Sequence, residues 1–164
     1  MLRQILVPVD FSACARQVAC HAFDLARAIG GQVTLLHVLE DQEPQEARDL
    51  LRQFSALARL PPECLVMPVS GPFPAGVAAV ILEVAAQRGA DLIVLGLRGP
   101  AQRSPLGQVA VQVLLGALVP VQVVPCGQVA RPGSGWRSLL AQEAQTQAAQ
   151  TQLAQTRPGP GAAR

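Results

Sequence analysis

The chain has 164 residues, 50% of them hydrophobic, which suits one domain with a sizeable core and an appendage. Its formal net charge of +2 combines residues 1–127 (9 Arg against 10 Asp and Glu, net −1) with the remainder (4 Arg against Glu143, net +3). Because only 3% of residues are aromatic and no basic stripe occurs, we expect no nucleic-acid partner. Lysine is absent, which excludes a P-loop lysine, a Schiff-base lysine and a lysine general base.

Apolar runs in the chain are short. None approaches the roughly 18 residues of a membrane span, and the run near the first residue is too short for a signal-peptide core. We therefore expect a cytoplasmic protein without a membrane span. The scattered cysteines form no C-x-x-C pair and are predicted to be small buried hydrophobic residues, with neither a zinc site nor a disulfide framework: Cys14, Cys20, Cys64 and Cys126.

Strand-like and helix-like patterns alternate along the chain. The first strand is followed by Ser12 as a plausible helix N-cap, and the helix after it ends at Gly30. The second helix is expected to continue through Leu57 and Ala58 until Pro61 and Pro62 end it. Strands are predicted at 5–9, 33–38, 64–69, 91–96 and 121–124, and helices around 13–29, 47–58, 77–85 and 106–117.

These elements predict the fold class and two regions of the chain. The runs at 5–9 and 92–95 are continuously apolar, as strands covered on both faces must be. We therefore expect an α/β domain over residues 1–127, with an open, five-stranded, mostly parallel sheet and helices on both faces. Residues 128–164 read as a linker and an Ala/Gln/Thr-rich, disordered tail, in which Trp136 and Leu139-Leu140 are the only apolar anchors for a partner.

Two strand ends carry residues suited to a ligand. Asp10 follows the first strand and offers a carboxylate to an exocyclic amine or a ribose hydroxyl, and Gly96 and Gly99 surround the end of the fourth strand. Ligands bind at the carboxyl ends of parallel strands, where glycines and a helix N-terminus accommodate anions. The same residues also fit a plain reading, in which the glycines form a turn and Asp10 is a cap.

Several segments together resemble the universal stress protein family over about residues 3–126. They are ILVPVDFS at 5–12, LLHV at 35–38, GADLIVLG at 89–96 and PVQVV at 120–124, in the family's order. The resemblance implies strand order 3-2-1-4-5 and a homodimer through the last strand, Val121–Val124. In one branch of the family it also implies ATP bound through the pattern G-x2-G-x9-G-[S/T].

The resemblance carries over to particular residues, with departures. Asp10 matches the acidic residue near adenine and ribose, and Val38 matches the position that packs on the base. Seven residues rather than nine separate Gly99 from Gly107, and Gln108 stands where Ser or Thr is expected. Ser104, Arg98 and Arg103 could compensate as phosphate partners. The expected nucleotide site comprises Pro8, Val9, Asp10, Val38, Gly96, Arg98, Gly99, Gly107, Gln108 and Val109.

The leading functional hypothesis is a nucleotide-sensing regulatory module. It would bind ATP or another adenine nucleotide, with or without Mg2+, and act on an unknown protein partner. The alternative is a ligand-free, homodimeric interaction module; a flavin or other cofactor-binding domain would share the fold but has no further support. We expect no conventional enzyme, although slow ATP hydrolysis stays open, and His21 and His37 are interpreted as packing histidines rather than acids or bases.

Overall fold

The computed structural model describes residues 2–40, 42–97 and 107–125. These residues belong to one compact unit, Met1–Gly127. The predicted tail at 128–164 lies outside the described residues and remains a prediction. Along the described chain, strands and helices alternate in the order β1 (Gln4–Pro8), α1 (Ala13–Ile29), β2 (Gln32–Leu39), α2 (Pro44–Ser55), β3 (Glu63–Pro68), α3 (Ala75–Gln87), β4 (Leu92–Gly96), α4 (Gln108–Gly116) and β5 (Val121–Val124).

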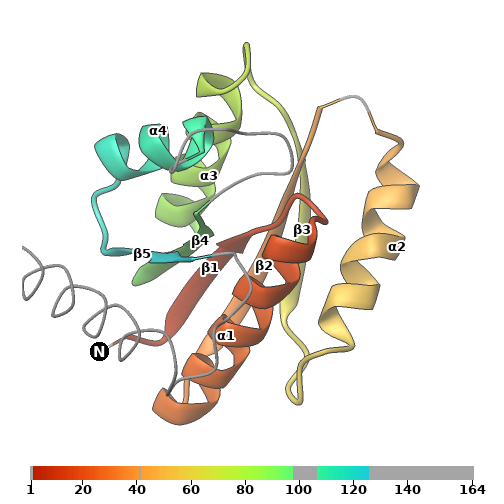
Figure 1. Ribbon diagram of the computed structural model, residues 1–164, viewed down its shortest axis with the longest axis vertical. Helices are drawn as coiled ribbons and strands as arrows, with labels where there is room; N and C mark the ends of the chain where they lie inside the picture. Colours follow the sequence, from red (N-terminus) through yellow and green to blue (C-terminus); the bar gives the residue numbers. More distant parts are fainter. Residues whose placement is uncertain (1, 41, 98–106, 126–164) are drawn as a thin grey trace, which may run out of the picture. The chain divides into compact units, whose positions relative to one another are not determined.

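The strands form one parallel sheet, which lies between α1 on one side and α3 and α4 on the other in Figure 1. Its order is β3-β2-β1-β4-β5, and every neighbouring pair is parallel. This confirms the predicted fold class and the strand order that the resemblance implies. Because β1 pairs with β2 on one side and β4 on the other, the chain changes its direction of travel across the sheet between β1 and β4.

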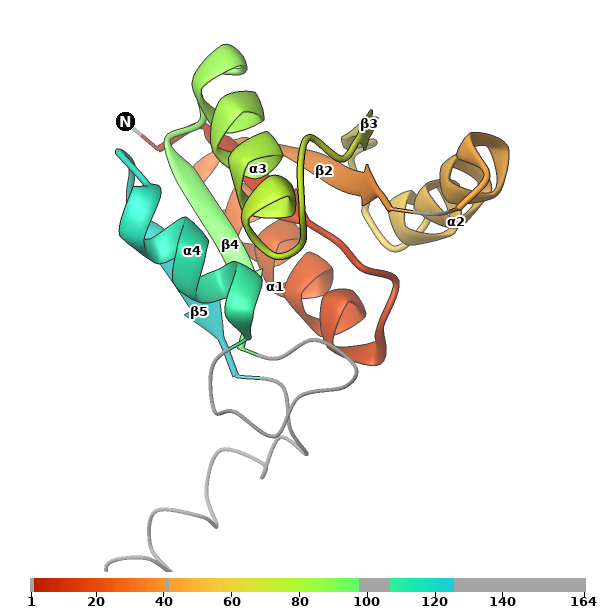
Figure 2. The ribbon, with the colours of Figure 1, turned by 90° about the horizontal axis from the view of Figure 1, so that it is seen from above.

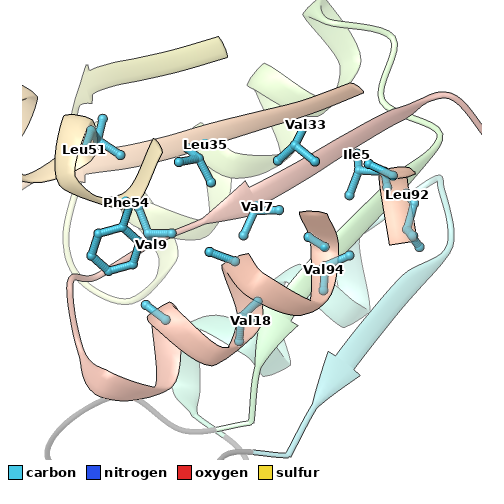
Figure 3. Close-up of a cluster of buried hydrophobic side chains, with 14 residues drawn as sticks. Ile5, Val7, Val9, Val18, Val33, Leu35, Leu51, Phe54, Leu92 and Val94 are labelled. Atoms are coloured by element: carbon cyan, nitrogen blue, oxygen red, sulfur yellow. The ribbon is translucent and has the colours of Figure 1, made fainter. Parts of the chain in front are cut away.

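Helices cover both faces of the sheet, as Figure 2 shows from above. On one face α1 and α2 pack against a cluster that includes Val7, Val18, Leu35 and Val94, each 0% exposed. Figure 3 shows this cluster in detail. On the other face α3 and α4 pack against a second cluster that contains Ile93. The central strands are therefore buried on both faces, which explains their continuous apolar sequences.

Helix α1 begins and ends where the sequence predicts. The Ser12 hydroxyl oxygen accepts a hydrogen bond from the Ala15 N–H (3.1 Å), which satisfies one of the free donors of the first turn. At the other end Gly30 adopts the left-handed conformation, with φ 68°, and its N–H donates to the Ala26 carbonyl. These two caps fix both ends of the helix that follows β1.

Two helix boundaries differ from the prediction. Helix α2 ends at Ser55 rather than near Pro61, because the Leu57 and Ala58 N–H groups donate to carbonyls three residues earlier and Leu57 turns toward solvent. The Ser55 hydroxyl also bonds the Arg52 carbonyl at this point. Gly107 is the N-cap of α4 and not its second residue. Leu114 of this helix is exposed, whereas Val113 is buried.

The cysteine prediction is wrong in part. Cys20 and Cys64 are exposed free thiols, and Cys14 is half-buried against the core and disulfide-bonded, although no disulfide was expected. Although Cys64 is exposed as a residue, partial desolvation of its thiol raises the pKa, and the neighbouring Glu63 carboxylate raises it further. Among the described residues no helix is both long and apolar enough to cross a membrane.

Candidate functional site

A cavity of about 610 Å³ opens at the carboxyl ends of β1, β2 and β4. It lies where the chain direction across the sheet reverses, which is the usual ligand position in open α/β sheets. Its volume is within the range of about 300–1,000 Å³ that small-molecule sites occupy. The end of β1, the end of β2, the start of α4 and the connection between β3 and α3 all contribute to its wall.

Most residues of the predicted nucleotide site line this cavity. The two exceptions, Arg98 and Gly99, lie outside the described residues, as do Arg103 and Ser104. The structure brings together residues from the ends of three strands, β1, β2 and β4, and from the start of α4, namely Pro8, Val9, Asp10, Val38, Gly96, Gly107, Gln108 and Val109.

The turn from β1 into α1 fixes the position of Asp10. One carboxylate oxygen of Asp10 accepts hydrogen bonds from the Ser12 N–H (3.1 Å) and from the Ser12 hydroxyl (2.6 Å). Asp10 is exposed, and among the described residues its second carboxylate oxygen makes no hydrogen bond. Asp10 is therefore both a turn-stabilising residue and a carboxylate available at the edge of the cavity.

Phe11 lies in this turn and stabilises it through aromatic contacts. It is the one non-glycine residue of the described chain with a positive φ, 59°, a conformation that costs free energy for a bulky side chain. Its ring packs 4.2 Å from the His37 ring and meets the edge of Phe54 at 5.7 Å between centroids. These aromatic contacts offset the backbone cost and keep Asp10 and Ser12 in register.

His37 is buried between β1 and the cavity. Its Nδ1 lies 2.8 Å from the Val9 carbonyl oxygen. Because a carbonyl can only accept, Nδ1 carries the proton and donates. Nε2 lies 3.2 Å from the side-chain amide of Gln42. His37 is thus the satisfied packing histidine that the sequence indicates, but it also lines the cavity, which the sequence reading missed.

His21, interpreted from the sequence as a packing histidine rather than an acid or base, is exposed. Its Nε2 lies 3.0 Å from the Gln122 side-chain amide, which joins α1 to β5. It does not line the cavity.

The N-terminus of α4 faces the cavity from the β4 side. Gly107 is the N-cap, and its N–H donates to the Leu97 carbonyl (2.9 Å). Its carbonyl accepts the first bond of the helix, from the Val111 N–H. The N–H groups of the first helical turn and the helix dipole together favour an anion at this position.

Several further cavity residues were missed by the sequence reading. Phe73, on the connection between β3 and α3, and Val77 and Ile81 of α3 form an apolar part of the wall, and Glu40 and Gln42 follow β2. The helical spacing of Val77 and Ile81 was visible in the sequence, but it indicated only that they are buried and not that they line a cavity. Phe73 sits between two prolines and belongs to no periodic pattern.

The amino end of the sheet is built differently. Asp91 accepts hydrogen bonds from the N–H groups of Arg3 (2.8 Å) and Gln4 (3.0 Å), which ties β4 to the start of β1. These bonds, that from Arg3 first, lower the pKa of the Asp91 carboxyl. A second hollow of about 800 Å³ lies at this end, between α1 and the connection from α2 to β3. Its carboxylates are engaged: Asp24 pairs with Arg27, and Glu63 pairs with Arg88 and Thr34.

Metal-ligand chemistry has little support in the described part of the chain. No group of three or more His, Cys, Asp or Glu side chains gathers there at ligand distances. The described part of the cavity presents the carboxylates of Asp10 and Glu40, the N–H groups at the start of α4, and apolar walls.

Solved structures of universal stress proteins share this fold. UspA from Lactobacillus plantarum is 26% identical, with 75% of this chain and 97% of that chain covered and a TM-score of 0.62. The Archaeoglobus fulgidus protein in complex with dAMP is 29% identical, with coverage of 75% and 98% and a TM-score of 0.58. A universal stress protein in complex with cAMP is 20% identical, with coverage of 77% and 98% and a TM-score of 0.61.

Sequence comparison places the chain in the same group. A search of curated protein sequences found no match. The sequence model of the universal stress protein family, however, matches residues 1–60 and 75–125, which is more than half of the chain. This match includes β1, β2 and β4, whose carboxyl ends line the cavity. The chain belongs to the universal stress protein family.

Proposed function

We propose that this protein is a nucleotide-sensing regulatory module that binds an adenine nucleotide in the cavity at the carboxyl ends of β1 and β4. The observation that carries the proposal is the meeting, in one cavity of about 610 Å³, of the Asp10 carboxylate, an apolar wall and the N-terminus of α4. A nucleotide has a group to match each of these three features. Its sugar is polar and suits the carboxylate, its aromatic base suits the apolar wall, and its anionic phosphate suits the helix N-terminus.

Several of the predicted site residues have a role in this proposal. The unused Asp10 oxygen accepts from a ribose hydroxyl or from the exocyclic amine of adenine. Val9 and Val38 pack against the nucleoside, and the N–H groups at the start of α4, behind Gly107, bind phosphate. A relative that is 29% identical was solved with dAMP, which supports an adenine nucleotide as the ligand.

The proposed activity is binding rather than turnover. In the described part of the cavity, Asp10 and Glu40 are the two carboxylates and His37 is the histidine. His37 is held by the Val9 carbonyl, which keeps Nδ1 from acting as a base. Binding would then change the surface that the domain offers to a protein partner.

We further propose that two copies pair through β5. This strand lies at the edge of the sheet. Pro120 and Val124 direct their carbonyls to β4, so Val121 and Val123, which alternate with them, direct their backbone groups outward. Light scattering should give a mass of two chains, and Val123→Pro, which removes an outward N–H, should shift it toward one.

The alternative is a ligand-free interaction module. It is favoured by Gln108, which stands at the first position of α4 and supplies no hydroxyl to a phosphate. Retention of AMP or ATP by the purified protein would count against it.

A thermal-shift titration of ligand-free protein tests the proposal. ATP, ADP, AMP, cAMP and GTP are compared with and without magnesium. A ligand present at about 100 times its Kd should raise Tm on the order of 5–10 °C. A rise with adenine nucleotides but not with GTP supports the proposal, whereas no rise with any nucleotide overturns it in favour of the ligand-free module.

A further inference from the structure

Phe73 is an exception among the aromatic residues of the described chain. Phe54 is buried, and Phe11 and Phe23 pack against the core. Phe73 is 52% exposed and belongs to neither core cluster, yet it lines the cavity at the carboxyl end of the sheet. An exposed aromatic ring at the rim of a cavity marks a surface that a ligand can cover.

The backbone around Phe73 is held firmly. The Gly76 N–H donates to the Pro72 carbonyl (2.7 Å), and the Ala78 N–H donates to the Pro74 carbonyl (3.1 Å). Gly76 is buried, and a Cβ there would lie 2.8 Å from the Ser70 carbonyl oxygen, so the connection packs directly on the first turn of α3. The hydrogen bonds on both sides of Phe73 therefore fix its backbone beside the cavity. Figure 1 shows this connection at the top of the view, arching from β3 to α3.

The surroundings of Phe73 suit an uncharged ring. Val77 and Ile81, from the helix that Phe73 precedes, continue the same wall as an apolar surface. The anion-binding feature of the cavity, the N-terminus of α4, belongs to a different element. The apolar, aromatic part of the wall and the helix N-terminus are thus supplied by different elements of the fold.

We propose that Phe73 is the residue on which the nucleobase of the bound nucleotide stacks. This inference rests on the proposed function and adds a binding residue to it. An aromatic side chain stacks on the π-face that every base has, so Phe73 contributes affinity for the base without selecting which base is bound. Selection among bases falls to the hydrogen-bonding groups at the strand ends, such as Asp10.

Titration calorimetry with AMP tests this role. Phe73→Ala should weaken AMP binding roughly 5- to 100-fold, the usual effect of removing one stacked aromatic residue. Phe73→Leu keeps an apolar side chain but no aromatic face, so it should lose most of the same affinity. Phe73→Trp should retain wild-type affinity or improve on it. Because Phe73 is half exposed and outside both core clusters, all three variants should keep the wild-type Tm.

Leu60→Ala is the matched control. Leu60 is another large exposed apolar residue (70% exposed), and it lies at the amino end of the sheet, beside the second hollow. Its removal should leave the Kd for AMP unchanged, and a loss equal to that of Phe73→Ala would overturn the inference.

The outcomes separate this inference from the proposed function. If the wild type binds AMP and Asp10→Ala weakens it while Phe73→Ala binds as the wild type does, stacking on Phe73 is wrong and the nucleotide site stands. If Phe73→Leu binds as tightly as the wild type while Phe73→Ala does not, Phe73 covers the ligand without stacking, which also overturns the inference. If the ligand-free wild type binds no adenine nucleotide, the proposed function itself fails.

Discussion

Carboxylate side chains occur at both ends of the parallel sheet, but they have different hydrogen-bonding partners at each end. At the amino end, Asp91 accepts from two backbone N–H groups of β1, and Glu63 is engaged by Thr34 and Arg88. At the carboxyl end, Asp10 engages only Ser12 and keeps one oxygen free of hydrogen bonds to the described residues. The carboxylates of Asp91 and Glu63 connect separate elements, whereas Asp10, among the described residues, bonds only within its own turn.

This difference indicates how a small α/β domain separates stability from binding. The side-chain hydrogen bonds of the amino end join the start of β1 to the start of β4 and join β2 to β3. The carboxyl end is shaped by backbone features, including the positive φ of Phe11 and the close packing of Gly76. Changes at the amino end should therefore affect the free energy of unfolding, and changes at the carboxyl end should affect ligand affinity.

The largest effect is expected at Asp10. Asp10→Ala removes a charged hydrogen-bond acceptor, worth about 1.5–3 kcal/mol, so AMP should bind roughly 10- to 100-fold more weakly by calorimetry. Asp24→Ala is the matched control, because Asp24 is also an exposed aspartate on or near α1 but pairs with Arg27. An equal loss of affinity in both variants would contradict the role given to Asp10.

A smaller effect is expected at Gly76. A Cβ at this position meets backbone oxygens of the preceding connection, which cannot move as a side chain can. Gly76→Ala should lower the free energy of unfolding by about 1–3 kcal/mol, measured by urea denaturation, and weaken AMP binding by displacing Phe73.

Gly116→Ala is the control for this change. The nearest atom to a Cβ there is the Leu82 Cδ1 atom at 2.6 Å, which is the end of a flexible side chain. The expected loss of stability is therefore smaller than for Gly76→Ala. Equal losses would show that the connection before α3 is not closely packed.

Asp91 should affect stability in a pH-dependent way. The backbone N–H groups of Arg3 and Gln4 lower its pKa in the folded state, so its charged form stabilises the fold above the unfolded pKa of about 4. That contribution is lost as the pH falls through the lowered pKa. Asp91→Asn should therefore be less stable than wild type at pH 7, and the difference should shrink at pH 3, with AMP affinity at pH 7 unchanged. A difference that grows toward pH 3 would contradict this assignment.

The smallest effect is expected for the Arg88–Glu63 ion pair. Its nitrogen and oxygen lie 2.6 Å apart, but both side chains are more than 40% exposed. Solvent screens such a pair, so Arg88→Ala should lower the free energy of unfolding by at most about 1 kcal/mol, measured by urea denaturation. A loss several times larger would mean that this end of the sheet depends on the pair.

Much of the fold could be predicted because buried strands and helices have recognisable patterns of apolar residues in the sequence. The apolar run at Ile5–Val7 and the helical spacing of Val18 and Ala22 identify a covered strand and an amphipathic helix. The same spacing places Cys20 on the opposite side of α1 from Val18, so its exposure was readable from the sequence even though composition suggested burial. The strand order came from the family resemblance, not from periodicity.

The candidate site was predictable only where its residues adjoin strands. Asp10 and Gly107 lie next to apolar runs that fix their position at the carboxyl ends. Phe73 could not be found in this way, because its place at the cavity depends on tertiary packing of Gly76 against a preceding carbonyl. His37 likewise reads as a core residue, and only the geometry shows that a core residue also forms part of the wall.

The central claim is that the carboxyl end of the sheet is the binding end. Mapping of backbone amide chemical shifts by NMR during titration with AMP tests it most directly. The account predicts saturable shifts at Val9, Asp10, Val38, Gly96 and Gly107, with little change at Gln4, Gly31, Glu63 and Asp91. Shifts concentrated at the second group would place the ligand at the amino end and contradict the account, and no shifts in either group would show that the domain binds no adenine nucleotide.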